Sequence, residues 1–132
     1  MELHDFEQEF NKIWKSADYK KKQQILREFD RIVNRKESEN KRNKAFFQAV
    51  KSERVSAVKK ILDQGVDVNL KDDVLGNTAL SHAVFAGNME MIKMLLNHGS
   101  APHIENNRGY NAIDAAKLMG NVEIINFLKK EW

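Results

Sequence analysis

One segment of the sequence occurs twice, 33 residues apart, and this repetition limits the possible folds more than any other feature. Residues 76–88 match residues 109–121 position by position, and the match continues at three further pairs: Glu90 and Glu123, Ile92 and Ile125, Leu95 and Leu128. Self-similarity with a period in the low thirties is typical of stacked helical repeats. Such repeats offer partners an extended surface instead of a single catalytic cleft. The sequence therefore predicts an all-α repeat fold.

The composition fits one domain with a hydrophobic core. The chain has 132 residues, of which 42% are hydrophobic and 31% charged, as in ordinary globular proteins. It has no cysteine, which excludes disulfides and thiolate chemistry and makes a reducing, cytoplasmic location the simplest expectation. No apolar run approaches the length of a membrane span, and the first residues do not resemble a signal peptide.

Two amphipathic helices are predicted before the repeats. Apolar residues at helical spacing follow one another at Phe6, Phe10, Ile13 and Trp14, and they form one stripe along a helix. A second stripe lies on a helix from about residue 19 to residue 36: Ile25, Leu26, Phe29, Ile32 and Val33. Residues 37–43 are polar and lack periodicity, which predicts a linker between the helical pair of residues 1–36 and a repeat domain of residues 44–132.

Each repeat is predicted to contain two short helices. In the second repeat one helix carries Leu80, Ala83 and Val84 on its apolar face, and the next carries Ile92, Leu95 and Leu96. Matching apolar residues stand 34 positions earlier: Phe46, Ala49, Val50, Val58, Ile61 and Leu62. Gly99 follows the second helix, where a residue without Cβ adopts positive φ at low cost. The three repeats span about residues 44–72, 73–105 and 106–132.

These residues resemble the ankyrin-repeat family. The resemblance rests on Gly76-x-Thr78-Ala79-Leu80, Ala83, Gly87-Asn88, Leu95-Leu96 and Gly99, together with the turn Gly65-Val66-Asp67-Val68-Asn69. It covers about residues 43–130 and is specific because many motif residues occur together at the spacing of the family's repeat. It implies a solenoid of helix-turn-helix repeats with β-turn fingers projecting from one edge.

The sequence departs from the family pattern at two places. The family's Pro-Leu-His becomes Ala79-Leu80-Ser81 in the second repeat and Ala112-Ile113-Asp114 in the third, so Ser81 or Asp114 could cap backbone donors locally instead. Glu53 stands where the later repeats have Gly87 and Gly120. The first repeat is therefore predicted to be an adapted end unit.

A three-repeat stack leaves an apolar face open at each end. The helical pair of residues 1–36 is predicted to cover the first repeat, with its apolar residues buried against each other and against that repeat: Phe6, Phe10, Trp14, Ile25, Leu26 and Phe29. This prediction makes the N-terminal segment a structural cap.

No catalytic, cofactor-binding or metal-binding motif is found. The four histidines show no ligand spacing, and no nucleophile elbow or phosphate loop is present, because Gly76 and Gly109 are glycines of the repeat turns. The sequence predicts a protein that is not an enzyme.

The positive charge lies in one block. Residues 15–44 contain 11 Lys and Arg against 5 Asp and Glu, whereas residues 45–132 contain 10 of each sign. We favour the interpretation that these charges form the solvated face of a helix. The alternative is that this basic helix binds a nucleic acid or another polyanion. Polyanion binding would weaken steeply with salt, whereas binding through buried apolar contacts would not.

The sequence predicts a protein-protein interaction module that binds through its concave face. The candidate partner-binding residues combine variable finger positions with the inner faces of the first helices of the repeats: Leu75, Asn77, His82, Phe85, Asn107, Arg108, Tyr110, Leu118 and Met119. Exposed apolar patches mark partner sites. The concrete form that we favour is a stand-alone inhibitor, immunity-type or effector protein, with no small-molecule substrate.

Overall fold

The computed structural model describes residues 3–131, and it divides the chain into two compact units. Unit 1 comprises residues 1–40 and unit 2 comprises residues 41–132. The described residues form helices joined by turns and loops, with a single isolated β-bridge between Lys71 and Thr78. The predicted all-α fold is confirmed.

Unit 1 contains α1 (Leu3–Ser16) and the first part of α2 (Tyr19–Lys51). Asp18 caps α2, because its Oδ1 accepts a hydrogen bond of 2.8 Å from the backbone N–H of Lys21. The apolar stripe of α1 forms a ladder of rings, in which Phe10 stacks on Phe6 on one side and on Trp14 on the other.

The apolar side chains of unit 1 are not buried as the sequence predicts. Phe6 is 56% exposed, Phe10 40%, Leu26 43% and Phe29 62%. The two stripes lie on α1 and α2, but a pair of helices forms one thin layer and covers only part of such large side chains. The burial prediction is wrong for these residues, and a capping role of residues 1–36 stays a prediction.

The predicted linker at residues 37–43 is helical. α2 continues without a break from Tyr19 to Lys51, so the segment joins the predicted second helix to the first helix of the first repeat. The segment contains neither Gly nor Pro, and its Glu, Lys and Arg residues favour helix. Arg35 also pairs with Glu39 one turn later at 3.5 Å. A helix that is polar all round is stable in solvent with such pairs, and for this reason its lack of apolar periodicity does not indicate a loop.

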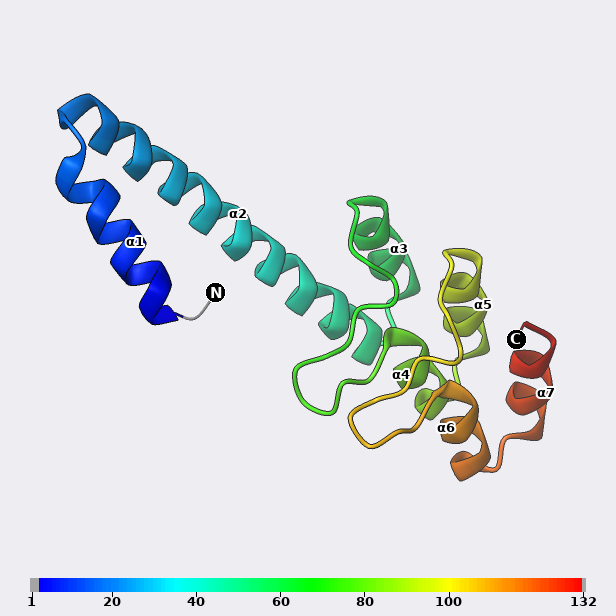
Figure 1. Ribbon diagram of the computed structural model, residues 1–132. Coiled ribbons are helices and arrows are strands. Elements are labelled where there is room, and N and C mark those ends of the chain that lie inside the picture. The colour runs from blue at the N-terminus through cyan, green and yellow to red at the C-terminus, as the bar shows by residue number, and fades with distance from the viewer. Residues whose placement is uncertain (1–2, 132) are drawn as a thin grey trace. The chain divides into compact units, whose positions relative to one another are not determined.

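Unit 2 consists of helix pairs in two rows (Figure 1). The inner row contains the last turns of α2, then α4 (Ala79–Ala86) and α6 (Ala112–Met119). The outer row contains α3 (Val55–Asp63), α5 (Met89–Asn97) and α7 (Val122–Glu131). Long turns connect α3 to α4 and α5 to α6, and we call them finger 1 (residues 65–78) and finger 2 (residues 99–111).

The core of unit 2 runs continuously through all the repeats. Its completely or almost completely buried side chains come from both rows: Phe46, Val58, Leu80, Val84, Met91, Ile92, Leu95, Ile124 and Leu128. Most of these are positions that the helical spacing predicts, because each repeat buries its apolar face only by stacking on its neighbours. Met91 and Ile124 were not predicted, and Ile125, the match of Ile92, is only partly buried.

The turn between the two helices of each repeat has the same backbone conformation. Gly87 and Gly120 have φ of 69° and 67°, and Glu53 at the equivalent place in the first repeat has φ of 58°. A Cβ destabilises this left-handed conformation by about 1–2 kcal/mol. The first repeat thus keeps the turn of the later repeats although its residue is unfavourable there, which is evidence that packing determines the turn.

Candidate functional site

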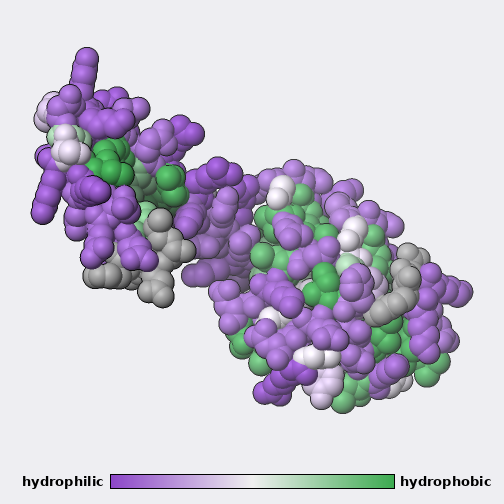
Figure 2. Space-filling model, viewed as in Figure 1, coloured by the Kyte–Doolittle hydropathy of each residue, from purple (hydrophilic) through white to green (hydrophobic). Residues whose placement is uncertain are grey.

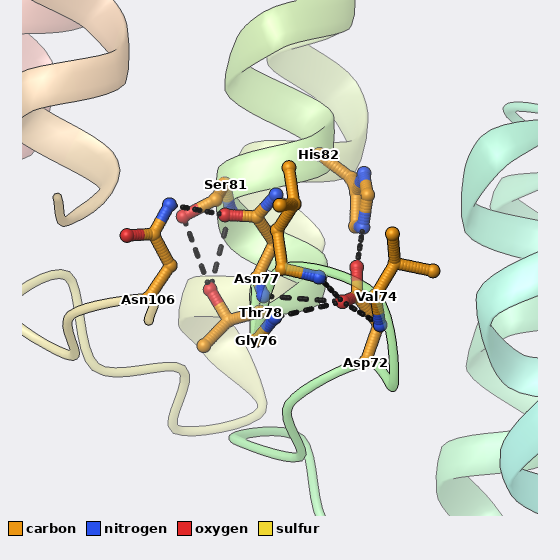
Figure 3. Close-up of polar contacts among 9 residues, drawn as sticks. Asp72, Val74, Gly76, Asn77, Thr78, Ser81, His82 and Asn106 are labelled. Atoms are coloured by element: carbon orange, nitrogen blue, oxygen red, sulfur yellow. Dashed lines mark hydrogen bonds and ion pairs between the residues drawn. The ribbon is translucent and has the colours of Figure 1, made fainter. Parts of the chain in front are cut away.

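Asp72 determines the shape of finger 1 (Figure 3). Its Oδ1 accepts hydrogen bonds from the backbone N–H groups of Val74, Leu75, Gly76 and Asn77 at 3.0–3.3 Å. One carboxylate oxygen therefore takes the place of the backbone acceptors that a regular element would supply. The turn that carries Leu75 is held in one conformation.

Asn106 has the corresponding position in finger 2. Its Oδ1 accepts from the backbone N–H groups of Arg108 at 2.9 Å and Tyr110 at 3.0 Å. Its side-chain Nδ2 donates to Oδ1 of Asn77 at 2.9 Å, so the same residue also ties finger 2 to finger 1.

Two further contacts join neighbouring repeats. The backbone N–H of Asn107 donates to the carbonyl of Leu75 at 2.9 Å. Asn69 Oδ1 accepts from the backbone N–H of Ala101 at 2.8 Å. Side-chain amides and backbone groups thus connect the turns in this chain, in which the family's usual histidine is replaced.

The helices after the fingers are capped locally. Asn111 and Asp114 form a reciprocal capping box at the start of α6, which confirms the predicted role of Asp114. At the start of α4 the cap is Thr78, whose Oγ1 accepts from the backbone N–H of Ser81 at 3.3 Å. Ser81 is therefore capped by its neighbour and does not provide the cap itself.

His82 is held between finger 1 and the first repeat. Its Nε2 lies 2.7 Å from Oδ2 of Asp72, and its ring packs edge-on against Phe47 with ring centroids 6.0 Å apart. Burial raises the pKa of the Asp72 carboxyl, but the hydrogen bonds from His82 and from the backbone of Leu75 and Val74 outweigh it and hold that pKa below its ordinary value. The pair stabilises the finger with Asp72 ionised.

Two of the nine predicted partner-binding residues are thus not on the exposed surface. Asn77 is 7% exposed and bonds to Asn106, while the side chain of His82 is 19% exposed and bonds to Asp72. The helical spacing placed His82 on the face opposite the core, but it gave no sign that finger 1 folds back over this face. Both side chains hold the scaffold.

The other seven predicted residues are exposed and form two groups. The finger group contains Leu75, Asn107, Arg108 and Tyr110. The helix-end group contains Phe85 (39% exposed), Leu118 (79%) and Met119 (54%) at the last turns of α4 and α6. Because these helices begin at the fingers, about 12 Å of helix separates the groups along each repeat.

One exposed residue beside the helix-end group was not predicted. Val122 at the start of α7 is 65% exposed. Its equivalents Val55 and Met89 pack against the core, so the repeat pattern contains no signal for exposure at this position. Val122 is a further exposed apolar side chain close in the sequence to Leu118 and Met119.

The basic segment carries opposite charges close to some of its cations. Arg31 pairs with Glu28 at 3.4 Å and Arg35 with Glu39 at 3.5 Å, both on exposed stretches of α2. These pairs reduce the local positive charge, as the solvated-face interpretation predicts.

Within residues 3–131 no group of three or more His, Cys, Asp or Glu side chains is placed to bind a metal ion. In the same part of the chain, no helix combines the length and the apolar character that crossing a bilayer requires.

Comparison with known proteins gives the same fold assignment. A family model described as ankyrin repeats in three copies matches residues 32–131. The human palmitoyltransferase ZDHHC17 is 38% identical over 84 residues, which are 64% of this chain and 13% of that protein. The putative ankyrin repeat protein FPV018 of fowlpox virus is 42% identical over 59 residues, or 45% of this chain and 8% of that protein.

The mouse 2-5A-dependent ribonuclease is 35% identical over 65 residues, which are 49% of this chain and 9% of that protein. The chain thus spans a small fraction of each of these relatives, and what they share with it is the repeat region. The match of the family model extends over most of the chain and includes all the helix pairs of unit 2. The chain belongs to the ankyrin-repeat family.

Proposed function

We propose that this protein binds another protein through the exposed apolar side chains of unit 2 and has no catalytic activity of its own. Ankyrin repeats are in general protein-protein interaction modules. The observation that carries the proposal is the helix-end group, in which Leu118 is 79% exposed and Met119 54%. Large apolar side chains that stay in water on a well-packed domain mark a partner site.

The finger group supplies the second part of the proposed surface. Tyr110 is 58% exposed, and its backbone N–H is fixed by Asn106. An exposed aromatic side chain on a rigid turn loses little conformational entropy on binding and is a common anchor of interfaces. Arg108 on the same turn would add charge selectivity at the rim, which affects partner choice and association rate more than affinity.

The finer form of the proposal is a stand-alone inhibitor, immunity-type or effector protein that covers a surface of its partner. The enzymatic activities in the names of the relatives do not extend to this chain, because the aligned segments are ankyrin repeats and amount to 8–13% of those proteins. Binding without turnover is what the exposed surface can provide.

The alternative is binding of a nucleic acid or another polyanion through residues 15–44. The excess of positive charge in this block favours it, whereas the pairs Arg31–Glu28 and Arg35–Glu39 oppose it. Neutralising several phosphates releases counterions, so such binding would fall steeply as the salt concentration rises.

The test uses the full chain as bait in extracts of its native cells, followed by titration of the purified partner. Tyr110→Ala should weaken binding by about 2 kcal/mol, or roughly thirtyfold in Kd. Tyr19→Ala is the matched control, because Tyr19 is also an exposed tyrosine (78%) but lies on unit 1. The proposal fails if both variants bind normally, or if binding disappears between 50 and 200 mM salt and depends on Lys20 or Arg27.

A further inference from the structure

An apolar groove lies between α1 and α2 in unit 1. It has a volume of about 570 Å³ and is lined by six apolar and three polar side chains from both helices: Phe6, Phe10, Lys21, Gln24, Ile25, Leu26, Glu28, Phe29 and Ile32. Figure 2 shows hydrophobic side chains among the hydrophilic ones on this unit. The groove has no part in the surface proposed above.

The side chains along the groove are large and remain in contact with water. Phe29 is 62% exposed, Phe6 56% and Ile32 53%. A pair of helices presents one apolar stripe per helix and has no second layer to cover them, whereas four helices enclose such stripes in a common core. The groove therefore has the shape and chemistry of half a helical bundle.

The charges at the groove indicate what covers it. Lys21 and Glu28 both line the groove, and they lie seven residues apart, which is two turns, about 10.5 Å, along the same face of α2. A partner helix whose charges have one sign would attract one of these residues and repel the other. A second α2 running antiparallel, with a two-fold axis beside residues 24 and 25, brings each Lys21 opposite Glu28 of the second copy.

We propose that the groove of unit 1 is closed by the same groove of a second copy of this chain. In this antiparallel, two-fold arrangement the pair between Lys21 of one copy and Glu28 of the other forms twice, and Ile25 of each copy lies beside the two-fold axis. The contact is isologous, so one surface serves both partners and the assembly closes at two copies. The chain is then a dimer that carries two ankyrin-repeat units.

Charge reversal tests the register of the proposed dimer. Sedimentation equilibrium of the full chain should show a monomer–dimer equilibrium. Lys21→Glu alone and Glu28→Lys alone should each weaken it by about tenfold or more, because each creates two like-charge contacts by symmetry. The double variant Lys21→Glu with Glu28→Lys should restore it, because the opposite signs face each other again.

Matched controls separate the interface from the helix itself. Glu28 also pairs with Arg31 within α2 at 3.4 Å, and Arg31→Ala removes this competing pair without changing the groove lining, so it should not weaken dimerisation. Phe29→Ala should weaken the dimer, whereas Tyr19→Ala, which lies outside the groove, should not. Circular dichroism at 222 nm checks that each variant keeps its helices.

A chain that is monomeric at all concentrations up to about 0.5 mM would overturn the proposal, since interfaces weaker than millimolar represent less than about 4 kcal/mol. A dimer unaffected by Phe29→Ala and by both single charge reversals would also overturn it, because a different surface would then join the copies. Tyr110→Ala should leave dimerisation unchanged, which keeps this result independent of the proposed partner binding.

Discussion

Replacing Gly76 by alanine should damage the chain far more than the same change at Gly109. Both glycines have positive φ, 71° and 82°, and in both the new Cβ costs about 1–2 kcal/mol of backbone strain. The surroundings differ. A Cβ on Gly109 meets open space, whereas a Cβ on Gly76 would collide with the side chain of Asn107, lying 2.9 Å from its Cγ and 3.3 Å from its backbone N.

The exposed side chain of Asn107 can rotate away from the new Cβ, but its backbone cannot move without further cost. Its backbone N–H donates to the carbonyl of Leu75 at 2.9 Å, so a shift of finger 2 breaks a contact between repeats. Forcing additional atoms into such a packed contact typically costs about 1–3 kcal/mol. Gly76→Ala should therefore lower the free energy of unfolding by about 2–5 kcal/mol, against about 1–2 kcal/mol for Gly109→Ala.

Urea unfolding of the full chain, followed by circular dichroism at 222 nm, measures the difference. The double variant should lose less than the sum of the two single variants if the fingers act together. Equal losses for Gly76→Ala and Gly109→Ala, within about 0.5 kcal/mol, would refute the claim that finger 2 packs tightly on finger 1.

Three other substitutions test the scaffold of unit 2. Asp72→Ala should cost about 2–4 kcal/mol, because it leaves four backbone donors and His82 without their acceptor. Since the folded pKa of Asp72 is lowered, its contribution is complete above the unfolded pKa of about 3.9 and is lost as the pH falls toward the folded value. Urea titrations from pH 7 to pH 2.5 measure the free energy of unfolding of the unsubstituted chain and of Asp72→Ala. The difference between the two should narrow only below about pH 4. Glu53→Gly should be neutral or stabilising by up to about 1 kcal/mol, whereas Gly87→Ala should cost about 1 kcal/mol, as thermal unfolding can show. Equal effects of these two changes would contradict the shared turn conformation.

The repeat period predicted most of unit 2 because the same packing recurs in each repeat. Leu80 and Leu95 are buried as their spacing requires, and Gly99 has the expected positive φ of 91°. The burial of side chains is less regular in the last repeat, where Val122 is exposed although the equivalent Met89 packs on the core. Periodicity describes the interior of a stack better than its surface.

The predictions that were wrong concern features that a one-dimensional pattern does not contain. Residues 37–43 were predicted as a linker without periodicity, but they are helical, because a solvated helix can be polar on every face; the domain bounds themselves stay a prediction. His82 was placed on an exposed face from its position on α4, whereas Asp72, ten residues earlier, holds it in the finger. The exposed stripes of unit 1 show the same limit, because amphipathicity predicts that a face needs a partner and does not say which partner.

Photocrosslinking from position 118 tests the central claim most directly. A photoreactive phenylalanine in place of Leu118, which is 79% exposed, should form a covalent adduct with one partner protein in the native cells. The same group at Lys60, an exposed position on the outer helix α3, is the control and should form none. Adducts from position 60 but not from position 118, or adducts from position 118 with nucleic acid alone, would contradict the account.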